Sequence, residues 1–256
     1  MKKFCLLLAC SPLFATVNEP LRWEWSTGYR SDDFHWHLLE STDGSSVYTE
    51  HYPTLQFWQN NLQLRVVHRD LTFFAQGGVG GFGSGLQEPL NIPTKSLAAD
   101  GLGWFGYAVN LTADRFYRVI LTPLVGYEGH VLHLHPQGSP SEHTSWNGWL
   151  FGGDISFQPL RPMRLYAGYA YHLLHARLSV KDPALSFHFS EGGNYGHSGW
   201  AEWNYCLTRF WRVGLEGTIT YLFSSTQDVT VNEDLSRRLK IRWTAISGLV
   251  TLSGEF

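Results

Sequence analysis

Short clusters of histidine and acidic residues have the types and spacing that could support chemistry. His133 and His135 lie two residues apart, so on a β-strand they share a face and could bind one metal ion. Glu142 or His143 would have to supply the remaining ligands. The same cluster, with His130 upstream, is also typical of a solvated, histidine-rich loop base, and this is the interpretation that we favour.

Two further clusters could also have either a chemical role or a purely structural one. His35 and His37 flank a tryptophan and could be a metal-binding pair or a solvated strand segment. The adjacent carboxylates of Asp32 and Asp33 could share a proton and activate water, but such pairs more commonly cap a turn.

The glycine-rich run 77–83 lacks the Lys-Ser/Thr that follows a phosphate-binding loop. We therefore predict no catalytic residue, no metal site and no cofactor.

The composition excludes several classes of protein. Charged residues make up 16% of the 256 residues, aromatic residues make up 15%, and glycine contributes 26 residues. A disordered chain would be poorer in aromatic residues and richer in charge. The net charge of −3 excludes nucleic-acid binding through bulk charge. The mean hydropathy of −0.18 indicates that apolar and polar residues are interspersed, as they are in alternating β-strands.

The first residues resemble a bacterial secretory signal. A basic start, an apolar segment and the small residue Ala15 at a plausible cleavage position predict a signal peptide over residues 1–15 and a single domain over 16–256. A lipoprotein signal with a lipidated Cys10 is the alternative. Cys206 is the single later cysteine, so no intramolecular disulfide is expected. No later segment approaches the roughly 18 continuous apolar residues of a transmembrane helix.

The rest of the chain alternates apolar and polar side chains. In the clearest segment, Trp211, Val213 and Leu215 fall on one face, and Arg212 and Glu216 fall on the other. The same alternation predicts ten strands, at residues 21–38, 52–66, 70–84, 101–112, 115–133, 145–158, 163–178, 196–207, 210–223 and 238–256.

The connections between these strands alternate in length. Short turns are followed by long loops, and this asymmetry is typical of outer-membrane barrels, whose short turns are periplasmic. The sequence therefore predicts an all-β, closed antiparallel up-and-down transmembrane β-barrel of about ten strands, with both termini at the periplasmic end. A secreted β-sandwich is the alternative. The predicted long loops are residues 39–51, 85–100, 134–144, 179–195 and 224–237.

Two strand irregularities and the last residue add detail. The apolar parity of the first strand shifts near Ser31–Asp33, which predicts a bulge, and Asn60-Asn61 indicates a similar break in the second strand. Phe256 ends an amphipathic segment of about ten residues. This segment resembles the C-terminal signal of bacterial outer-membrane barrels, which implies that Phe256 is the membrane-insertion signal and that the barrel-assembly machinery is a partner.

The polar face of the predicted strands carries both signs of charge and would line the lumen. We interpret it as a cross-linked network that fills a narrow lumen, because an eight-stranded barrel is already nearly filled by side chains. Arg212 and Glu216 are expected to pair with Glu202 and Arg164 on neighbouring strands. A charged constriction that selects solutes is the alternative. The predicted network is Arg22, Glu24, Arg118, Glu128, Asp154, Arg164, His172, Glu202, Arg212 and Glu216.

Ten strands, five long loops and this length resemble the omptin fold of outer-membrane proteases. The family carries two acidic residues separated by one position in its second long loop and an Asp-x-His pair in its fourth. Here the second loop offers Glu88 and Asp100, and the fourth offers Asp182, His188 and Glu191, neither set in the required spacing. No catalytic residue therefore carries over from the family.

The segment 28–36 also resembles outer-membrane proteins of chlamydia-like bacteria, a group that includes porin-like members. Taken together, the sequence predicts a protein of the outer membrane of a Gram-negative-type bacterium. We expect a structural, adhesive or receptor-like role, with an omptin-like endopeptidase and a small porin as alternatives. The expected partners are outer-membrane lipid or lipopolysaccharide and an external or host ligand bound through the loops.

Overall fold

The computed structural model describes residues 19–68, 70–112, 117–160, 162–181, 185–232 and 235–255. The predicted signal peptide, Cys10, Asp182 and Phe256 lie outside the described residues. The strands are β1 (Glu19–Leu39), β2 (Ser46–His68), β3 (Leu71–Gln87), β4 (Ile92–Tyr107), β5 (Val109–Asn110), β6 (Arg118–Pro136), β7 (Glu142–Leu160), β8 (Met163–Lys181), β9 (Ser186–Cys206), β10 (Trp211–Phe223), β11 (Gln227–Val231) and β12 (Leu235–Glu255).

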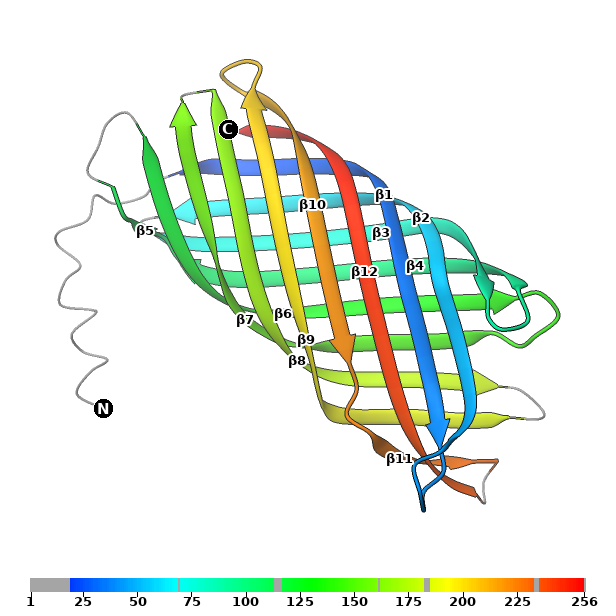
Figure 1. Ribbon diagram of the computed structural model, residues 1–256. Coiled ribbons are helices and arrows are strands. Elements are labelled where there is room, and N and C mark those ends of the chain that lie inside the picture. The colour runs from blue at the N-terminus through cyan, green and yellow to red at the C-terminus, as the bar shows by residue number, and fades with distance from the viewer. Residues whose placement is uncertain are drawn as a thin grey trace, which may run out of the picture.

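Ten long strands form a closed antiparallel ring (Figure 1). Each strand pairs with its neighbours in chain order, and β1 pairs with β12 from Arg22 opposite Glu255 to Leu39 opposite Arg238. The short strand β5 pairs with β6, and β11 forms a small hairpin with β12. The predicted closed up-and-down barrel is therefore confirmed. No helix within the described ranges is long and apolar enough to cross a membrane.

The two ends of the barrel differ. At the turn end, where both described termini lie, β2 and β3 are joined by a tight turn in which Asp70 has a left-handed backbone (φ 74°). At the opposite, loop end, the connections are much shorter than predicted. β2 alone has 23 residues, whereas a membrane-spanning strand needs about 9–11. The strands therefore continue through most of the segments that were predicted to be loops, and about half of their length lies beyond a bilayer.

Strand β1 shows why the alternation pattern did not predict the full length of the strands. Its even-numbered side chains point inward throughout, from Arg22 to Leu38. Near the turn end the outward residues are apolar, and Trp25 and Tyr29 are 44% and 47% exposed. Near the loop end the inward residues are apolar, and Trp36 is fully buried. The parity shift near Ser31–Asp33 therefore marks a change in the surroundings of the strand, and not a change in the direction of its side chains.

One of the two predicted strand irregularities is present, on the partner strand, and the other is absent. Between Asp32 and Phe34 the β1–β2 register does shift, but the extra residue is on β2, between Tyr52 and Leu55. Pairing of β1 with β12 is unbroken there. The predicted break at Asn60-Asn61 is wrong, because both residues pair in continuous register with β1 and β3.

The inside of the loop-end half is an apolar core. Large side chains from most strands of the ring fill it, and several of them have no exposed surface. Because each buried aliphatic or aromatic side chain stabilises the fold by about 1.5–3 kcal/mol, this core accounts for the long strands. Its members include Phe34, Trp36, Tyr52, Leu55, Phe57, Leu132, Leu134, Trp146, Leu178, Phe187, Phe189, Ile241 and Trp243.

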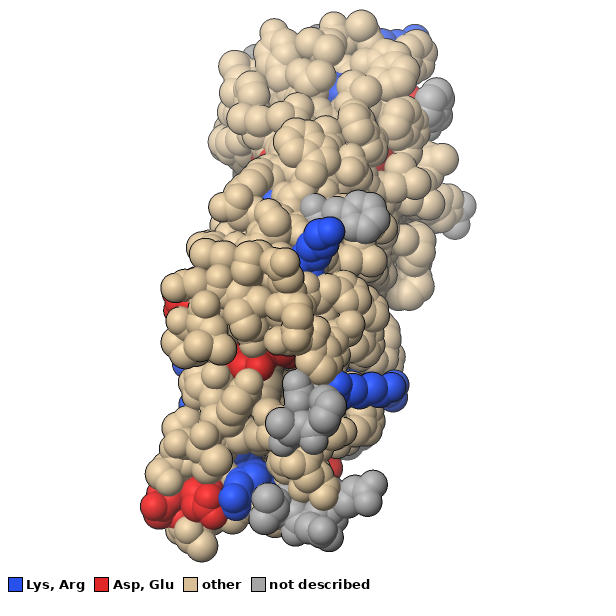
Figure 2. Space-filling model, turned by 90° about the vertical axis from the view of Figure 1, so that its right-hand side faces the viewer, with Lys and Arg blue, Asp and Glu red and all other residues tan. Residues whose placement is uncertain are grey.

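The outside of the turn-end half is an apolar belt between two aromatic girdles, the arrangement of a lipid-facing barrel wall. Leu62, Leu215 and Val250 are more than half exposed within the belt. In the face drawn in Figure 2, charged groups are sparse, and red and blue groups lie side by side only at its lower end. The girdle toward the loop end contains Tyr29, Trp58, Tyr127, Trp149, Tyr195 and Tyr221, and the girdle at the turn end contains Phe105, Tyr107, Trp203, Tyr205, Phe210 and Trp211.

Candidate functional site

The lumen of the turn-end half holds the ten residues that the sequence assigned to a charge network. All of them occupy positions with the inward parity of their strands. Glu24, Glu128, Asp154 and His172 are at most 4% exposed. The geometry divides the charged lumen residues into three groups along the barrel axis.

The first group, which we call the relay, crosses the lumen nearest the apolar core. Arg30 holds Asp32 in a bidentate ion pair, with contacts of 2.6 Å from Nε and 2.8 Å from Nη2, and also pairs with Asp100. His130 continues the chain, with Nδ1 2.8 Å from Asp100 Oδ1 and Nε2 3.1 Å from Glu128 Oε2.

Glu128 pairs in turn with His172, whose Nε2 lies 2.8 Å from Ser198 Oγ. The relay therefore links β1, β4, β6, β8 and β9 through side chains alone.

The second group lies in the middle of the belt. Arg22 pairs with Glu24 and Glu202, and Arg65 pairs with Asp154. Glu216 accepts a hydrogen bond of 3.1 Å from Gln63. Each charge has a polar partner, as a low-dielectric environment requires.

The third group lies at the turn end and corrects the predicted pairing. Arg212 lies 2.6 Å from Glu255 and Arg164 lies 3.9 Å from the same carboxylate. The register explains the difference from the prediction, because Arg212 is opposite Cys206 and Glu216 is opposite Glu202. Arg118 shares the inward parity at the same end.

Sequence reasoning missed six charged or titratable members of these groups, including Asp32, which was interpreted as half of an acidic pair, and Glu255 at the end of the last strand. Arg30 was passed over because the parity of β1 was interpreted as broken beside it, and Asp100 because it was assigned to a loop. His130 was assigned to a histidine-rich loop base, and Arg65 lies at the end of a predicted strand. Inward parity, counted from Arg22 without interruption, would have identified Arg30.

A cavity of about 170 Å³ lies within the charged lumen. Arg30, Glu128 and Glu216 are among its lining residues. Leu222 and Trp243 line it as well and also belong to the apolar core of the loop-end half. The cavity is therefore bounded by that core on the side toward the loops.

Glu142, which the sequence left open as an alternative metal ligand, lies in a different part of the barrel. It faces inward at the start of β7, is 4% exposed and accepts a hydrogen bond of 3.0 Å from Trp36 Nε1. The hydroxyl of Tyr52 lies 2.6 Å from Glu142 and 3.0 Å from Glu50. Burial, followed by the neighbouring Glu50, raises the pKa of Glu142 well above its usual range. The site is a buried carboxyl pair in the apolar core, on the loop-end side of the belt.

The histidines that formed the alternative metal site with Glu142 do not converge on one point. His133 and His143 face outward with their Nδ1 atoms 3.2 Å apart, and His135 lies 2.8 Å from Ser141 Oγ. Asp32 and Asp33 are mid-strand neighbours on opposite faces, so the proton-sharing pair and the turn cap are both wrong.

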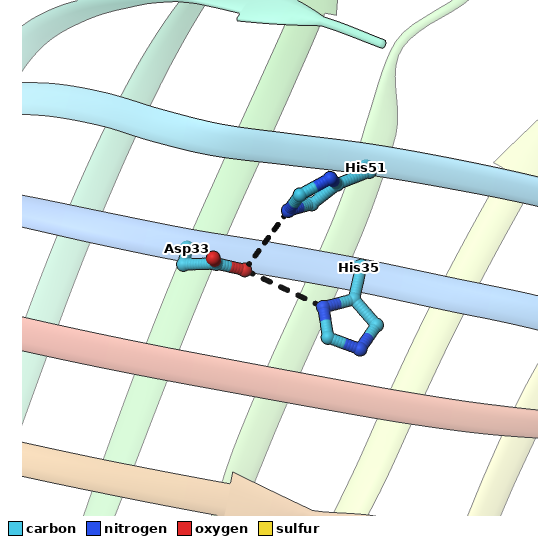
Figure 3. Close-up of side chains that lie close together, drawn as sticks. All are labelled: Asp33, His35 and His51. Carbon is cyan, nitrogen blue, oxygen red and sulfur yellow. Dashed lines mark hydrogen bonds and ion pairs between the residues drawn. The ribbon is translucent and has the colours of Figure 1, made fainter. Parts of the chain in front are cut away.

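Three other residues do come together on the outer wall of the loop-end half. Figure 3 shows that the side chains of His35 and His51 converge on Asp33. Asp33 Oδ1 lies 3.4 Å from His35 Nδ1 and 3.3 Å from His51 Nε2. On the far side of the His51 ring, Nδ1 lies 3.2 Å from Glu88 Oε2. Of the two acids of the predicted second loop, Glu88 therefore faces outward, and Asp100 faces the lumen.

Comparison with known proteins gives a fold but no family. No family model and no curated protein matches the sequence. The outer-membrane protease OmpT of Escherichia coli matches over 94% of this chain and 98% of its own, with a TM-score of 0.69 and 9% identity. The translocator domain of the autotransporter NalP from Neisseria meningitidis matches over 100% and 95%, with a TM-score of 0.45 and 14% identity. The chain therefore has the fold of an outer-membrane β-barrel of the omptin type.

The first prediction from the site compares two neighbours in sequence. Asp32→Ala should lower the free energy of unfolding by about 3–5 kcal/mol, because it leaves Arg30 in a buried site without its bidentate partner. Asp33→Ala, one position away and outward-facing, should cost less than about 1 kcal/mol in metal-free buffer. Urea titration of the refolded variants in lipid vesicles measures both, and equal losses would contradict the relay.

A second prediction concerns pH. Because the pKa of folded Glu142 is raised, the stability that its protonated form contributes is complete below the unfolded pKa of about 4.5 and is lost as pH rises through the folded value. Glu142→Gln removes this loss. The stability of the variant relative to wild type should therefore rise with pH, by up to about 1.4 kcal/mol per unit.

The exposed Glu191→Gln is the matched control and should show no such slope. Unfolding titrations from pH 4.5 to 9 measure the difference, and parallel curves for wild type and Glu142→Gln would exclude a buried, protonated Glu142.

Proposed function

We propose that the chain is a surface protein of the outer membrane of a Gram-negative-type bacterium, with a structural, adhesive or receptor-like role and without a solute path through its centre. The loop end faces outward in this proposal, and the short turns face the periplasm. The observation that supports it most directly is the apolar core, which fills the part of the barrel that would otherwise be a mouth or a substrate groove.

Contacts in two parts of the interior, the belt and the loop-end half, support the proposal that the barrel is closed. In the belt, ion pairs such as Arg22–Glu202 and Arg65–Asp154 join strands across the lumen. Above the belt, Trp36 and Phe187 pack edge to face across the core with ring centroids 5.3 Å apart. A conducting path would require both sets of contacts to open.

The outer wall of the loop-end half supports a role in contact with other molecules. The connections at this end are short, so the strand walls provide most of the surface. Eight of the twelve histidines lie on this wall. Three basic residues of β12, Arg238, Lys240 and Arg242, also face outward above the belt, where they would meet the phosphates of lipopolysaccharide. The histidines are His35, His37, His51, His133, His135, His143, His175 and His188.

Two alternatives make different predictions. A small porin requires a continuous aqueous path, and an omptin-like endopeptidase requires a substrate groove with an acidic pair and an Asp-x-His pair. Similarity to a protease in fold alone does not support the second, because one fold hosts many functions.

The refolded wild-type chain should give no steady conductance in planar bilayers at high salt, because its interior is closed in both the belt and the loop-end half. Heat-dependent migration in gels confirms that the barrel has folded, and a peptide-cleavage assay on the same preparation tests the protease alternative. A large conductance that scales with salt would overturn the closed barrel and favour the porin. Cleavage abolished by a single change in an outer-wall acid or histidine would favour the endopeptidase.

A further inference from the structure

We propose that Asp33, His35 and His51 form a binding site for a divalent transition-metal ion of the zinc class, with Glu88 supporting His51 from behind. The site lies on the outer wall of the loop-end half (Figure 3), outside both the lumen and the apolar core. It shares His35 with a histidine pair that the sequence left open as a metal-binding pair, and it is separate from the surroundings of His133 and His135.

The two distances from Asp33 match those between ligands of one ion. One ligand atom from each of the three residues lies within 4.8 Å of the other two. Zinc holds nitrogen and oxygen ligands at about 2.0–2.2 Å in a tetrahedron, which places neighbouring ligands about 3.3–3.6 Å apart. The separations of 3.4 Å and 3.3 Å from Asp33 Oδ1 fall in this range. They are long for N–H···O hydrogen bonds, which have donor–acceptor distances of about 2.7–3.2 Å.

The backbone positions all three ligands before an ion arrives. Asp33 and His35 are two residues apart on β1 and so share its outward face. His51 lies directly opposite His35 in the β1–β2 register. Ligands on two paired strands are held more firmly than ligands on loops, which lowers the entropy lost on binding.

Glu88 lies where metal sites usually have a carboxylate that holds a ligating histidine in place. Metal-bound histidines usually donate their other ring N–H to a carboxylate, which fixes the tautomer. His51 has this arrangement, with Nδ1 3.2 Å from Glu88 and Nε2 directed at Asp33. The position of Glu88 is itself fixed, because its backbone N–H donates a hydrogen bond of 2.8 Å to the carbonyl of His51.

The local charges suit a dication. Asp33 and Glu88 together offset a charge of +2. Arg242 lies opposite His35 in the β1–β12 register, and its guanidinium lies over the ring of Phe223 on β10, on the far side of β12.

The site is also accessible. The side chains of Asp33, His51 and His35 are 43%, 33% and 18% exposed. An ion bound by these three ligands keeps a fourth position for water or for a group from another molecule, as open zinc sites do.

A matched control exists on the same wall. His133 and His143 offer two nitrogens 3.2 Å apart, but they belong to no group of three ligands among the described residues. Removing one of these histidines deletes an exposed ring of the same kind and leaves the proposed site intact.

The test is calorimetric titration of the refolded full chain with Zn²⁺, after removal of metal with a chelator, together with the visible spectrum of bound Co²⁺. Wild type should bind one ion tightly, with the intense absorption of four-coordinate cobalt. Glu88→Gln should weaken binding by about 10–100-fold, as loss of a supporting carboxylate does. His51→Ala and Asp33→Asn should weaken it more, whereas His143→Ala should leave the affinity of the tight site unchanged.

Two outcomes would overturn the site. If wild type and His51→Ala bind Zn²⁺ with the same affinity, the ion is held by other histidines of the wall. If wild type binds no Zn²⁺ at micromolar concentrations, the cluster is an ion pair between His51 and its two carboxylates only. All four substituted positions are at the surface, and heat-dependent gel migration verifies that each variant has folded.

Discussion

The structure depends on the pairing of β1 with β12, which closes the ring. In hydrocarbon each backbone N–H and C=O must be paired within the protein, so a sheet edge cannot face lipid. This pairing runs without a shift from Arg22 to Leu39 on β1. A strand keeps its side-chain direction along its whole length. The outward side chains of one strand therefore face lipid near the turn end and water near the loop end. The chain meets both requirements by changing residue types, while the geometry of the strand stays the same.

This change of residue types gives the barrel two different interiors. Where lipid covers the outside, the inside contains charged residues joined in pairs, such as Arg30 with Asp32. Where the strands extend beyond the belt, the outside is polar, and the inside is an apolar core around Trp36 and Trp243. The charged groups of the first interior are paired, and the second interior is packed with apolar side chains, so both support the closed centre that we propose. What remains available for binding is the outer wall, where Asp33, His35 and His51 meet.

Much of the fold was predictable from the sequence, because strand alternation and turn asymmetry are local patterns. The inward positions of Glu24, Glu128 and Asp154 followed from the same count by twos. Strand length was not predictable in this way, because apolar residues inside a strand that leaves the membrane resemble a loss of pattern. The contact between His35 and His51 depends on a register that includes a bulge on β2, and the pairing of Asp100 with Arg30 spans the lumen. Neither contact has a signature in sequence spacing.

The central claim is that β1 crosses from lipid to water near Tyr29 with its side-chain direction unchanged. A scan of single spin labels from residue 21 to residue 39, in the predicted mature chain with Cys206 replaced by serine, measures it most directly. In lipid vesicles the odd positions should be accessible to oxygen up to Tyr29 and to a water-soluble nickel reagent from Ser31 onward, with even positions shielded from both throughout. Even positions beyond residue 31 that react with the nickel reagent, or odd positions there that stay in lipid, would contradict the account.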